Sequence, residues 1–287
     1  MVDDGSRDRT GEVARAFGAP VRCVHQDNRG LAAARNTGIR EARGEFVALL
    51  DADDEWLPHH LERAAAVLAA HPQLHWFCAA FERRRESGET DFQRVYRGPL
   101  EEGAYMGNYF EVQSKVEFSN SSAIVVRKRV FLELGGFDED IMMYGEDLDM
   151  WFRIALCYPQ IGYSRKVAAI YWGREGSIMA RDTGPNSGRF WRFIQRTDRL
   201  ASQADPAAAR RSEPLLVAWL SILIRRAIRE NDQRIIAQIR ETYGKRLKPS
   251  DKLLLVICRL VPNALIRRAG DLKTAVKRYL RRLRSRT

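Results

Sequence analysis

Three groups of acidic residues could do chemistry in this chain. The first contains Asp3 and Asp4, the second is the run DADDE at residues 51–55, and the third is Glu146 and Asp147. Carboxylates at such short spacing repel one another unless a cation lies between them. Oxygen ligands of this kind suit Mg²⁺ or Mn²⁺, above all where the partner carries phosphate. The groups therefore predict a divalent metal site for a phosphate-containing ligand.

Each acidic group also has a simpler interpretation. An EF-hand calcium loop is excluded for the second group, because Trp56 stands where that loop requires glycine. A DxD pattern is common in solvated acidic turns, so this group alone is weak evidence. Glu146 and Asp147 fall in the first turn of a predicted helix, where acids complement the helix dipole. The dipole explains Glu146, but it does not explain why all three groups fall at the ends of elements.

Short apolar runs alternate with helical patterns and must position these acids. The predicted strands cover residues 21–24, 45–50, 74–81, 122–126 and 167–172. The predicted helices cover residues 31–42, 58–70, 130–134 and 146–157, and the polar, weakly periodic segment 82–118 is predicted to be a long loop or a small excursion. Strands that alternate with helices predict an α/β fold with a mainly parallel sheet. Ligands of such sheets bind beyond the carboxyl ends of the strands, where the acids lie.

Five stretches, taken together and in order, resemble the family 2 inverting glycosyltransferases of the GT-A fold. They are VDDGSRDRT, NRGLAAARNTGI, GEFVALLDADDEWLP, GGFDE and GEDLDMWFR. The resemblance covers about residues 2–178 and implies a GT-A domain, with a Rossmann-like mainly parallel sheet, over residues 1–204. A basic helical region over residues 205–287 follows. The implied reaction moves a sugar from a nucleotide-diphosphate donor to a hydroxyl acceptor, in cell-surface polysaccharide or glycolipid synthesis.

The resemblance also implies roles for individual residues. Asp4 matches the acid that hydrogen-bonds the nucleotide base, and Asp51 matches the acid that contacts the ribose. Asp53 matches the acid that holds Mn²⁺ or Mg²⁺ on the diphosphate, and Asp147 matches the catalytic base. Arg35 matches the helix start that flanks the donor. It is expected either to face phosphate or to be an exposed structural arginine.

Asn120-Ser121-Ser122 precedes a predicted strand and could contact the sugar or the acceptor. An ordinary strand entry explains these three residues equally well.

Two departures from the family pattern stand out. The family begins with a strand and a turn that are internal to the sheet, and nothing precedes Met1 and Val2 here. We therefore expect the chain to be an N-terminally incomplete version of a longer protein. Several relatives place a histidine near the metal within the stretch that matches residues 171–177, which contains none here. The metal ligands other than Asp53 are therefore left open.

Charge is unevenly placed along the chain. Residues 1–150 carry 18 basic and 27 acidic side chains, net −9, whereas residues 151–287 carry 30 and 10, net +20. Such a basic half predicts an anionic partner. Segment 271–286 combines many basic residues with an apolar stripe formed by Leu272, Val276, Tyr279, Leu280 and Leu283. A basic amphipathic helix of this kind can lie on an anionic membrane surface, or it can pack on the domain with its charges solvated.

The remaining composition limits the function classes. The four cysteines include no CxxC pair, which argues against a zinc site and a disulfide framework and favours a reducing compartment. The predicted location is the cytoplasm, including a peripheral position on the inner face of the membrane. The expected partners are a nucleotide-sugar donor and a saccharide or lipid-linked acceptor. The basic tail lacks interleaved aromatics and a nucleic-acid-binding motif, so nucleic acid is not expected.

Two other functions compete with the enzyme. The chain could be a non-catalytic relative, or a basic protein that binds membranes or nucleic acid. Retention of Asp51, Asp53 and Asp147 favours the enzyme.

Overall fold

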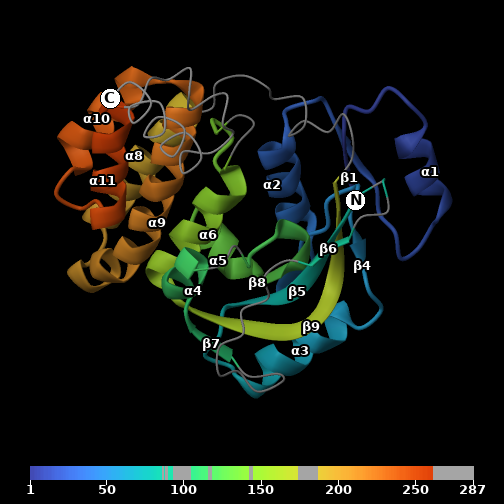
Figure 1. The fold of residues 1–287 in the computed structure, drawn as a ribbon. Coiled ribbons are helices and arrows are strands. Elements are labelled where there is room, and N and C mark those ends of the chain that lie inside the picture. The colour runs from blue at the N-terminus through green and yellow to red at the C-terminus, as the bar shows by residue number, and fades with distance from the viewer. Residues whose placement is uncertain are drawn as a thin grey trace. The chain divides into compact units, whose positions relative to one another are not determined.

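The computed structural model (Figure 1) describes residues 1–85, 87, 90–92, 105–115, 118–141, 145–173 and 187–260. The described residues form two compact units, one within residues 1–182 and 204–212 and the other within residues 183–203 and 213–260. The boundary at residue 204 stays a prediction, and helix α8, which precedes it, belongs to the second unit. The basic amphipathic helix predicted within segment 271–286 lies outside the described residues.

The first unit is an α/β structure. Its strands are β1 (Val2–Asp4), β2 (Val24–Gln26), β3 (Phe46–Ala48), β4 (Glu55–Trp56), β5 (Trp76–Arg85), β6 (Thr90–Phe92), β7 (Tyr105–Asn108), β8 (Ile124–Arg127) and β9 (Gln160–Gly173). Its helices are α1 (Thr10–Ala16), α2 (Leu31–Glu41), α3 (His60–Ala70), α4 (Tyr109–Lys115), α5 (Lys128–Glu133) and α6 (Glu146–Cys157), with a 3₁₀ turn η1 (Ser121–Ala123).

Two separate sheets organise this unit. Strands β1 and β2 pair in parallel, and a seven-stranded sheet has the order β3-β8-β5-β9-β4, with β6 added to β5 and β7 added to β9. The central pair β5–β9 is parallel, whereas the other pairings of this sheet are antiparallel. The predicted α/β class is confirmed, and the larger sheet is mixed. Strand β8 is reached through a long excursion that lets the chain return in the opposite direction.

The core is built on β5, whose side chains alternate between two covered faces. Phe77 joins a cluster with Val67 and Leu68 of α3, and Trp76 packs against Trp151 of α6 with ring centroids 6.5 Å apart. Helix α3 thus covers one face of the sheet, while α2 and α6 lie over the other (Figure 1). A strand covered on both faces must be apolar throughout, which explains the run WFCAAF.

The segment 82–118, predicted to be a long loop or a small excursion, contains regular elements. Strand β5 continues to Arg85, and strands β6 and β7 and helix α4 follow within this segment. Strands β6 and β7 lie at the margins of the sheet, where β6 pairs with β5 and β7 pairs with β9. Their hydrogen bonds come from distant partners, β7 pairing with β9, so local periodicity could not reveal them. Helix α1 was also missing from the predicted elements. The expected first strand before Met1 stays a prediction.

The second unit is helical. Its helices are α8 (Ser187–Gln203), α9 (Pro206–Glu230), α10 (Gln233–Tyr243) and α11 (Pro249–Leu260), and the first residues of α9 belong to the first unit. Aromatic contacts join them, such as Phe193 with Trp219 at 4.9 Å between ring centroids. Arg246 is hydrogen-bonded to Asp198 at 2.6 Å and to Glu213 at 2.5 Å.

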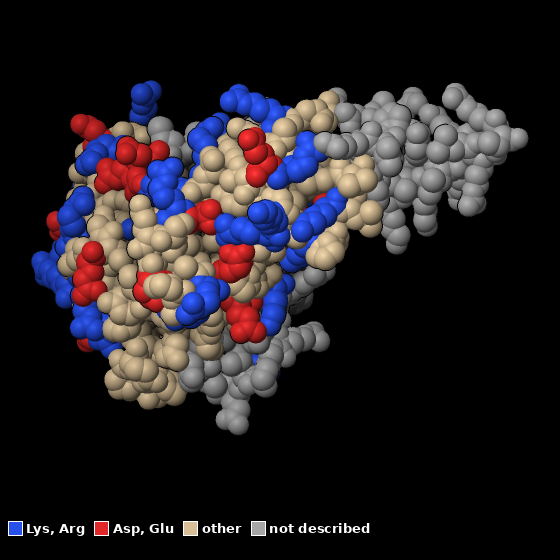
Figure 2. Space-filling model, turned by 90° about the vertical axis from the view of Figure 1, so that its left-hand side faces the viewer, with Lys and Arg blue, Asp and Glu red and all other residues tan. Residues whose placement is uncertain are grey.

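Two observations on the described residues concern membrane binding. Among these residues, no helix combines the length and apolar character needed to span a membrane. On the face drawn in Figure 2, basic and acidic side chains are interspersed rather than gathered into one basic patch.

His60, at the start of α3, is buried without hydrogen-bond partners. Its ring is 1% exposed and stacks on Trp56 with ring centroids 5.0 Å apart, and neither ring nitrogen has a partner. Burial lowers the pKa of His60 to about 4. Between pH 4 and 6.5, His60 is therefore protonated in the unfolded chain but not in the folded chain. Acidification through this range reduces the free energy of unfolding.

We expect His60→Phe to stabilise the protein. The free energy of unfolding should rise by about 1 kcal/mol at pH 7.5, because two unsatisfied buried nitrogens disappear. The gain should be about 2 kcal/mol larger at pH 4.5, because the variant no longer has the histidine that resists protonation. Urea denaturation at both pH values measures the difference, with His71→Phe at the other end of α3 as the control. A gain that does not change with pH would contradict the prediction.

Candidate functional site

Asp4 closes the end of β1 onto the loop before α2. Its Oδ1 accepts hydrogen bonds from Gln26 Nε2 at 2.7 Å and from the backbone N–H of Arg29 at 2.9 Å. Its Oδ2 accepts from the backbone N–H of Gly30 at 2.9 Å. Gly5 follows with φ +78°, and a Cβ there would lie 2.8 Å from the Asn28 nitrogen, so glycine is required for this close approach. Asp4 thus shapes the loop, and its contact with a nucleotide base stays a prediction.

Arg35 lies between two of the acidic groups. Its Nη2 donates to both carboxylate oxygens of Asp51, at 2.8 and 3.0 Å, and its Nη1 donates to Glu146 Oε1 at 3.0 Å. Burial alone would lower the pKa of Arg35, but the surrounding carboxylates, led by Asp51 and Asp147, outweigh burial and raise it. The side chain is only 7% exposed, so the expectation of an exposed arginine is wrong. Arg35 is buried because acids from two distant elements surround it.

Asp54 is committed to internal hydrogen bonds. Its Oδ2 accepts from the hydroxyl of Ser122 at 2.6 Å, and its Oδ1 accepts from the backbone N–H of Trp172 at 3.1 Å. Burial raises the pKa of Asp54 to about 6. The Ser122 oxygen also accepts from the backbone N–H of Asp51 at 3.1 Å. Asp54 therefore ties the 51–55 turn to η1 and β9, and both of its oxygens accept hydrogen bonds from within the fold.

Asp53 differs from its two neighbours. It is half-buried, and no hydrogen bond or ion pair within the described residues occupies its carboxylate. The described residues contain no cluster of three or more His, Cys, Asp or Glu that could hold a metal by itself. Mg²⁺ and Mn²⁺ often bind through one or two carboxylates and complete their shell with substrate phosphates. A free carboxylate at Asp53 fits a cation that arrives with a diphosphate.

Asp147 lies in the first turn of α6, beside Glu146. Its Oδ1 accepts from the backbone N–H of Leu148 at 2.7 Å, and its Oδ2 is 3.4 Å from the hydroxyl of Ser121. Burial raises the pKa of Glu146, and the neighbouring Asp147 raises it further, against the opposing effect of Arg35. The sequence-predicted residues Arg35, Asp51 and Asp147 therefore come together in one electrostatically coupled group.

The GGFDE stretch supports this group rather than joining it. Asn36 clamps the stretch, donating to the carbonyl of Phe137 at 2.9 Å and accepting from its N–H at 2.8 Å. Arg153 of α6 donates to the carbonyls of Leu134 and Gly136, both at 2.7 Å. These contacts fix α2 against α6. The family motif matches Asn36, like Arg35, to the helix start that flanks the donor, and the sequence did not indicate that Asn36 clamps this stretch.

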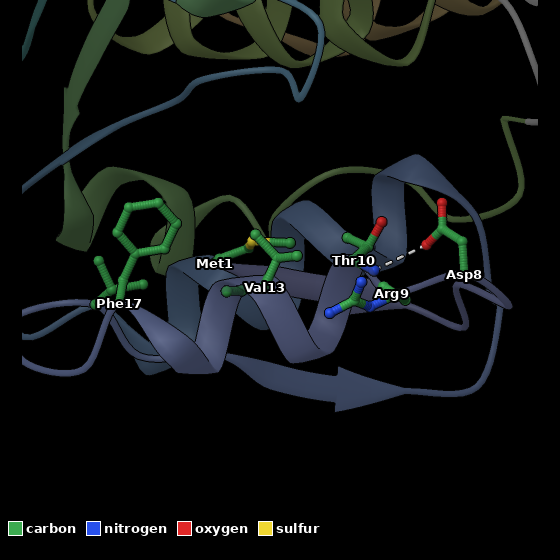
Figure 3. A pocket seen from close by; sticks show the side chains of 8 residues that line it. Met1, Asp8, Arg9, Thr10, Val13 and Phe17 are labelled. Carbon is green, nitrogen blue, oxygen red and sulfur yellow. Dashed lines mark hydrogen bonds between the residues drawn. The ribbon is translucent and has the colours of Figure 1, made fainter.

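A surface hollow lies apart from these residues. It has a volume of about 720 Å³ and is lined mainly by apolar side chains such as Met1, Val13 and Phe17 (Figure 3). None of the predicted site residues lines it.

Two family models match the chain. The model described as "Glycosyl transferase family 2" matches residues 1–135, and "Glycosyltransferase like family 2" matches residues 101–203. Together they cover both the 51–55 turn and α6.

Curated relatives agree with the family models. The chain is 47% identical over 57 residues to the uncharacterized glycosyltransferase EpsJ of Bacillus subtilis, which is 19% of this chain and 17% of that protein. It is 27% identical over 192 residues to glycosyltransferase GlyA of Streptococcus pneumoniae, or 62% of this chain and 26% of that protein. An uncharacterized glycosyltransferase of Rickettsia typhi is 23% identical over 63% of this chain and 53% of its own length. The matched segments thus span about half or less of these relatives.

Solved structures share the fold. S. aureus TarS 1-349 in complex with UDP-GlcNAc superposes with a TM-score of 0.61 and 18% identity, over 83% of this chain and 75% of that chain. The complex of TarS 1-349 with UDP gives a TM-score of 0.64 and 15% identity, over 94% and 80%. The likeness confirms the GT-A fold.

We expect Arg35→Met to destabilise the protein strongly. The variant leaves Asp51 and Glu146 partly buried without their cation, which costs about 3 kcal/mol of unfolding free energy at pH 7.5. The loss should be smaller at pH 4.5, because the uncompensated carboxylates can take up protons. Urea denaturation measures both values. Arg40→Met, on the exposed side of the same helix, should change stability by less than about 0.5 kcal/mol; equal losses for both variants would disprove the bridging role.

Proposed function

Because models of family 2 glycosyltransferases match residues 1–135 and 101–203, we propose that this chain moves a sugar from a nucleotide-diphosphate donor to a hydroxyl acceptor, with a divalent cation and with inversion at the anomeric carbon. One group of side chains carries the proposal. In this group Arg35 joins Asp51 to Glu146. Asp147 and the free carboxylate of Asp53 lie next to them. TarS structures with UDP-GlcNAc and UDP support a nucleotide-sugar donor.

Each acid has a separate task in the proposed reaction. Asp51 contacts the ribose, and Asp53 holds Mn²⁺ or Mg²⁺ at the diphosphate. When bound, the cation neutralises the charge that develops on the leaving diphosphate. Asp147 accepts the proton of the acceptor hydroxyl as its oxygen attacks the anomeric carbon from the face opposite the leaving group. A single displacement of this kind inverts the configuration.

Pre-organisation supports this division of work. The Asp51 backbone is fixed by Ser122, and Asp147 lies in the helix turn that Arg35 joins to Asp51 through Glu146. The carboxylates proposed to bind the sugar donor and the proposed base are thus held together before any ligand binds. Little reorganisation of these side chains is then needed during the reaction. The proposed acceptor is a saccharide or a lipid-linked saccharide for cell-surface polysaccharide or glycolipid synthesis, on the cytoplasmic side of the membrane.

Variants of two acids should separate binding from turnover. Asp53→Ala should weaken Mn²⁺-dependent UDP binding about tenfold or more, because the free carboxylate is lost. Asp147→Asn should keep UDP binding and lower turnover about 100-fold or more, because the proton acceptor is lost. Calorimetry measures binding, and a hydrolysis screen of nucleotide sugars finds the donor and measures turnover.

Glu55→Gln, at the last residue of the 51–55 turn, serves as the control for charge loss. Wild-type protein that binds UDP but turns over no nucleotide sugar with any acceptor would be a non-catalytic relative. NMR of the product, once the donor is known, reads the anomeric configuration, and a retained configuration would refute inversion.

The basic segment 271–286 is proposed to bind an anionic membrane surface. It lies outside the described residues, and the proposal rests on its charge and apolar stripe. We expect the full chain to co-sediment with anionic vesicles at low salt and a chain lacking residues 265–287 to stay in the supernatant. Neutral vesicles are the control. If both forms stay in solution with anionic vesicles, the surface is not a partner.

A further inference from the structure

A bound diphosphate would need a cation from the chain, and Arg35 is not available. Its Nη1 and Nη2 groups donate to Glu146 and Asp51, and its side chain, including the unpartnered Nε, is buried. The three consecutive arginines at the carboxyl end of β5, Arg83, Arg84 and Arg85, lie at the edge of the sheet where ligands of α/β folds bind.

Arg83 and Arg84 differ in how their charge is compensated. Arg84 pairs with Glu82 through two hydrogen bonds, at 3.2 Å from Nε and 3.1 Å from Nη2. Arg83 is exposed, and within the described residues no carboxylate pairs with it. Its guanidinium carbon lies 5.1 Å from the centroid of the Tyr171 ring. The ring therefore holds a cation whose hydrogen-bond donors remain open to a ligand.

Tyr171 places this cation beside the carboxylate turn. Strands β5 and β9 run parallel, with Arg83 opposite Tyr171. The next residue, Trp172, donates from its backbone to Asp54 Oδ1 at 3.1 Å and from its indole to Glu55 Oε1 at 2.9 Å. Burial raises the pKa of Tyr171, and the carboxylates of the 51–54 turn raise it further, as expected if they lie near its phenol. The end of β9 thus connects Arg83 to the turn that contains Asp53.

We propose that Arg83, held on the Tyr171 ring, binds the diphosphate group of the nucleotide ligand. This inference rests on the proposed function and adds a residue that the family resemblance did not assign. A guanidinium presents a planar pair of N–H donors that matches two phosphate oxygens, and stacking on an aromatic ring orients it in advance. The cation also compensates the extra negative charge that the diphosphate carries after it leaves the sugar. Arg83 escaped the sequence analysis because residues 82–118 looked like a loop.

Calorimetric titration of the full chain tests the proposal with three probes, UDP, inorganic pyrophosphate and uridine, each in the presence of Mn²⁺. Arg83→Ala should weaken binding of UDP and pyrophosphate about tenfold and leave uridine binding unchanged, because uridine has no phosphate. Arg83→Lys should recover only part of the loss, because an ammonium lacks the fork. Arg43→Ala removes an equal charge near the amino end of β3, at the opposite edge of the sheet, and should bind all three probes like wild type.

Variants of Tyr171 test the role of the ring. Tyr171→Phe keeps the ring and should bind UDP like wild type, whereas Tyr171→Leu should lose part of the affinity that Arg83→Ala loses. The loss of affinity caused by Tyr171→Leu should also vanish in the Arg83→Ala background, which a merely structural role would not produce.

The outcomes separate this inference from the proposed function. If wild type binds UDP and pyrophosphate with Mn²⁺ and Arg83→Ala binds them equally well, Arg83 is not a ligand and the proposed function stands. If wild type binds neither probe, both the proposed function and the role of Arg83 fall. Equal weakening of uridine and UDP by Arg83→Ala would show general damage to the site and would also overturn the proposal.

Discussion

One buried guanidinium organises the site. Arg35 neutralises carboxylates that come from the turn after β3 and from the start of α6, and without it these acids would repel one another at close range. A buried ion pair gains little net stability over apolar packing, but the loss of one partner is costly. The pairing therefore fixes where α2, the 51–55 turn and α6 can lie relative to one another.

Packing and polar contacts reinforce this arrangement from both sides. Trp151 anchors α6 on the sheet through Trp76, so the first turn of the helix cannot move away from Arg35. Ser122 links the Asp51 backbone to the buried carboxyl group of Asp54. The consequence is a division of labour within the DADD run. Asp51 is paired with arginine, Asp54 serves the fold, and Asp53 alone keeps a carboxylate without a hydrogen bond or ion pair in the described part of the chain.

The sequence predicted most of the elements that position the site. Helices at residues 31–42, 58–70 and 146–157 correspond to α2, α3 and α6 within two residues, because helix-forming composition, helix boundaries and apolar stripes are local signals. The acidic groups fall at the ends of helices and strands, as expected. The segment 82–118 was missed because strands β6 and β7 depend on partners far along the chain. The burial of His60 without hydrogen-bond partners could not be predicted either, since nothing in the adjacent sequence indicates burial.

By itself, the sequence determined that the chain has an α/β fold, where its acids lie along the elements, and the order of motifs that resembles family 2 glycosyltransferases. These properties depend on local periodicity and on residue types, and both can be read directly from the amino-acid sequence. The tertiary structure alone decided which cation meets which acid. Arg35 is separated from Asp51 by 16 positions and from Glu146 by 111, and Arg83 meets Tyr171 across neighbouring strands. Charge neutralisation acts through space, so its partners became known only when the chain had folded.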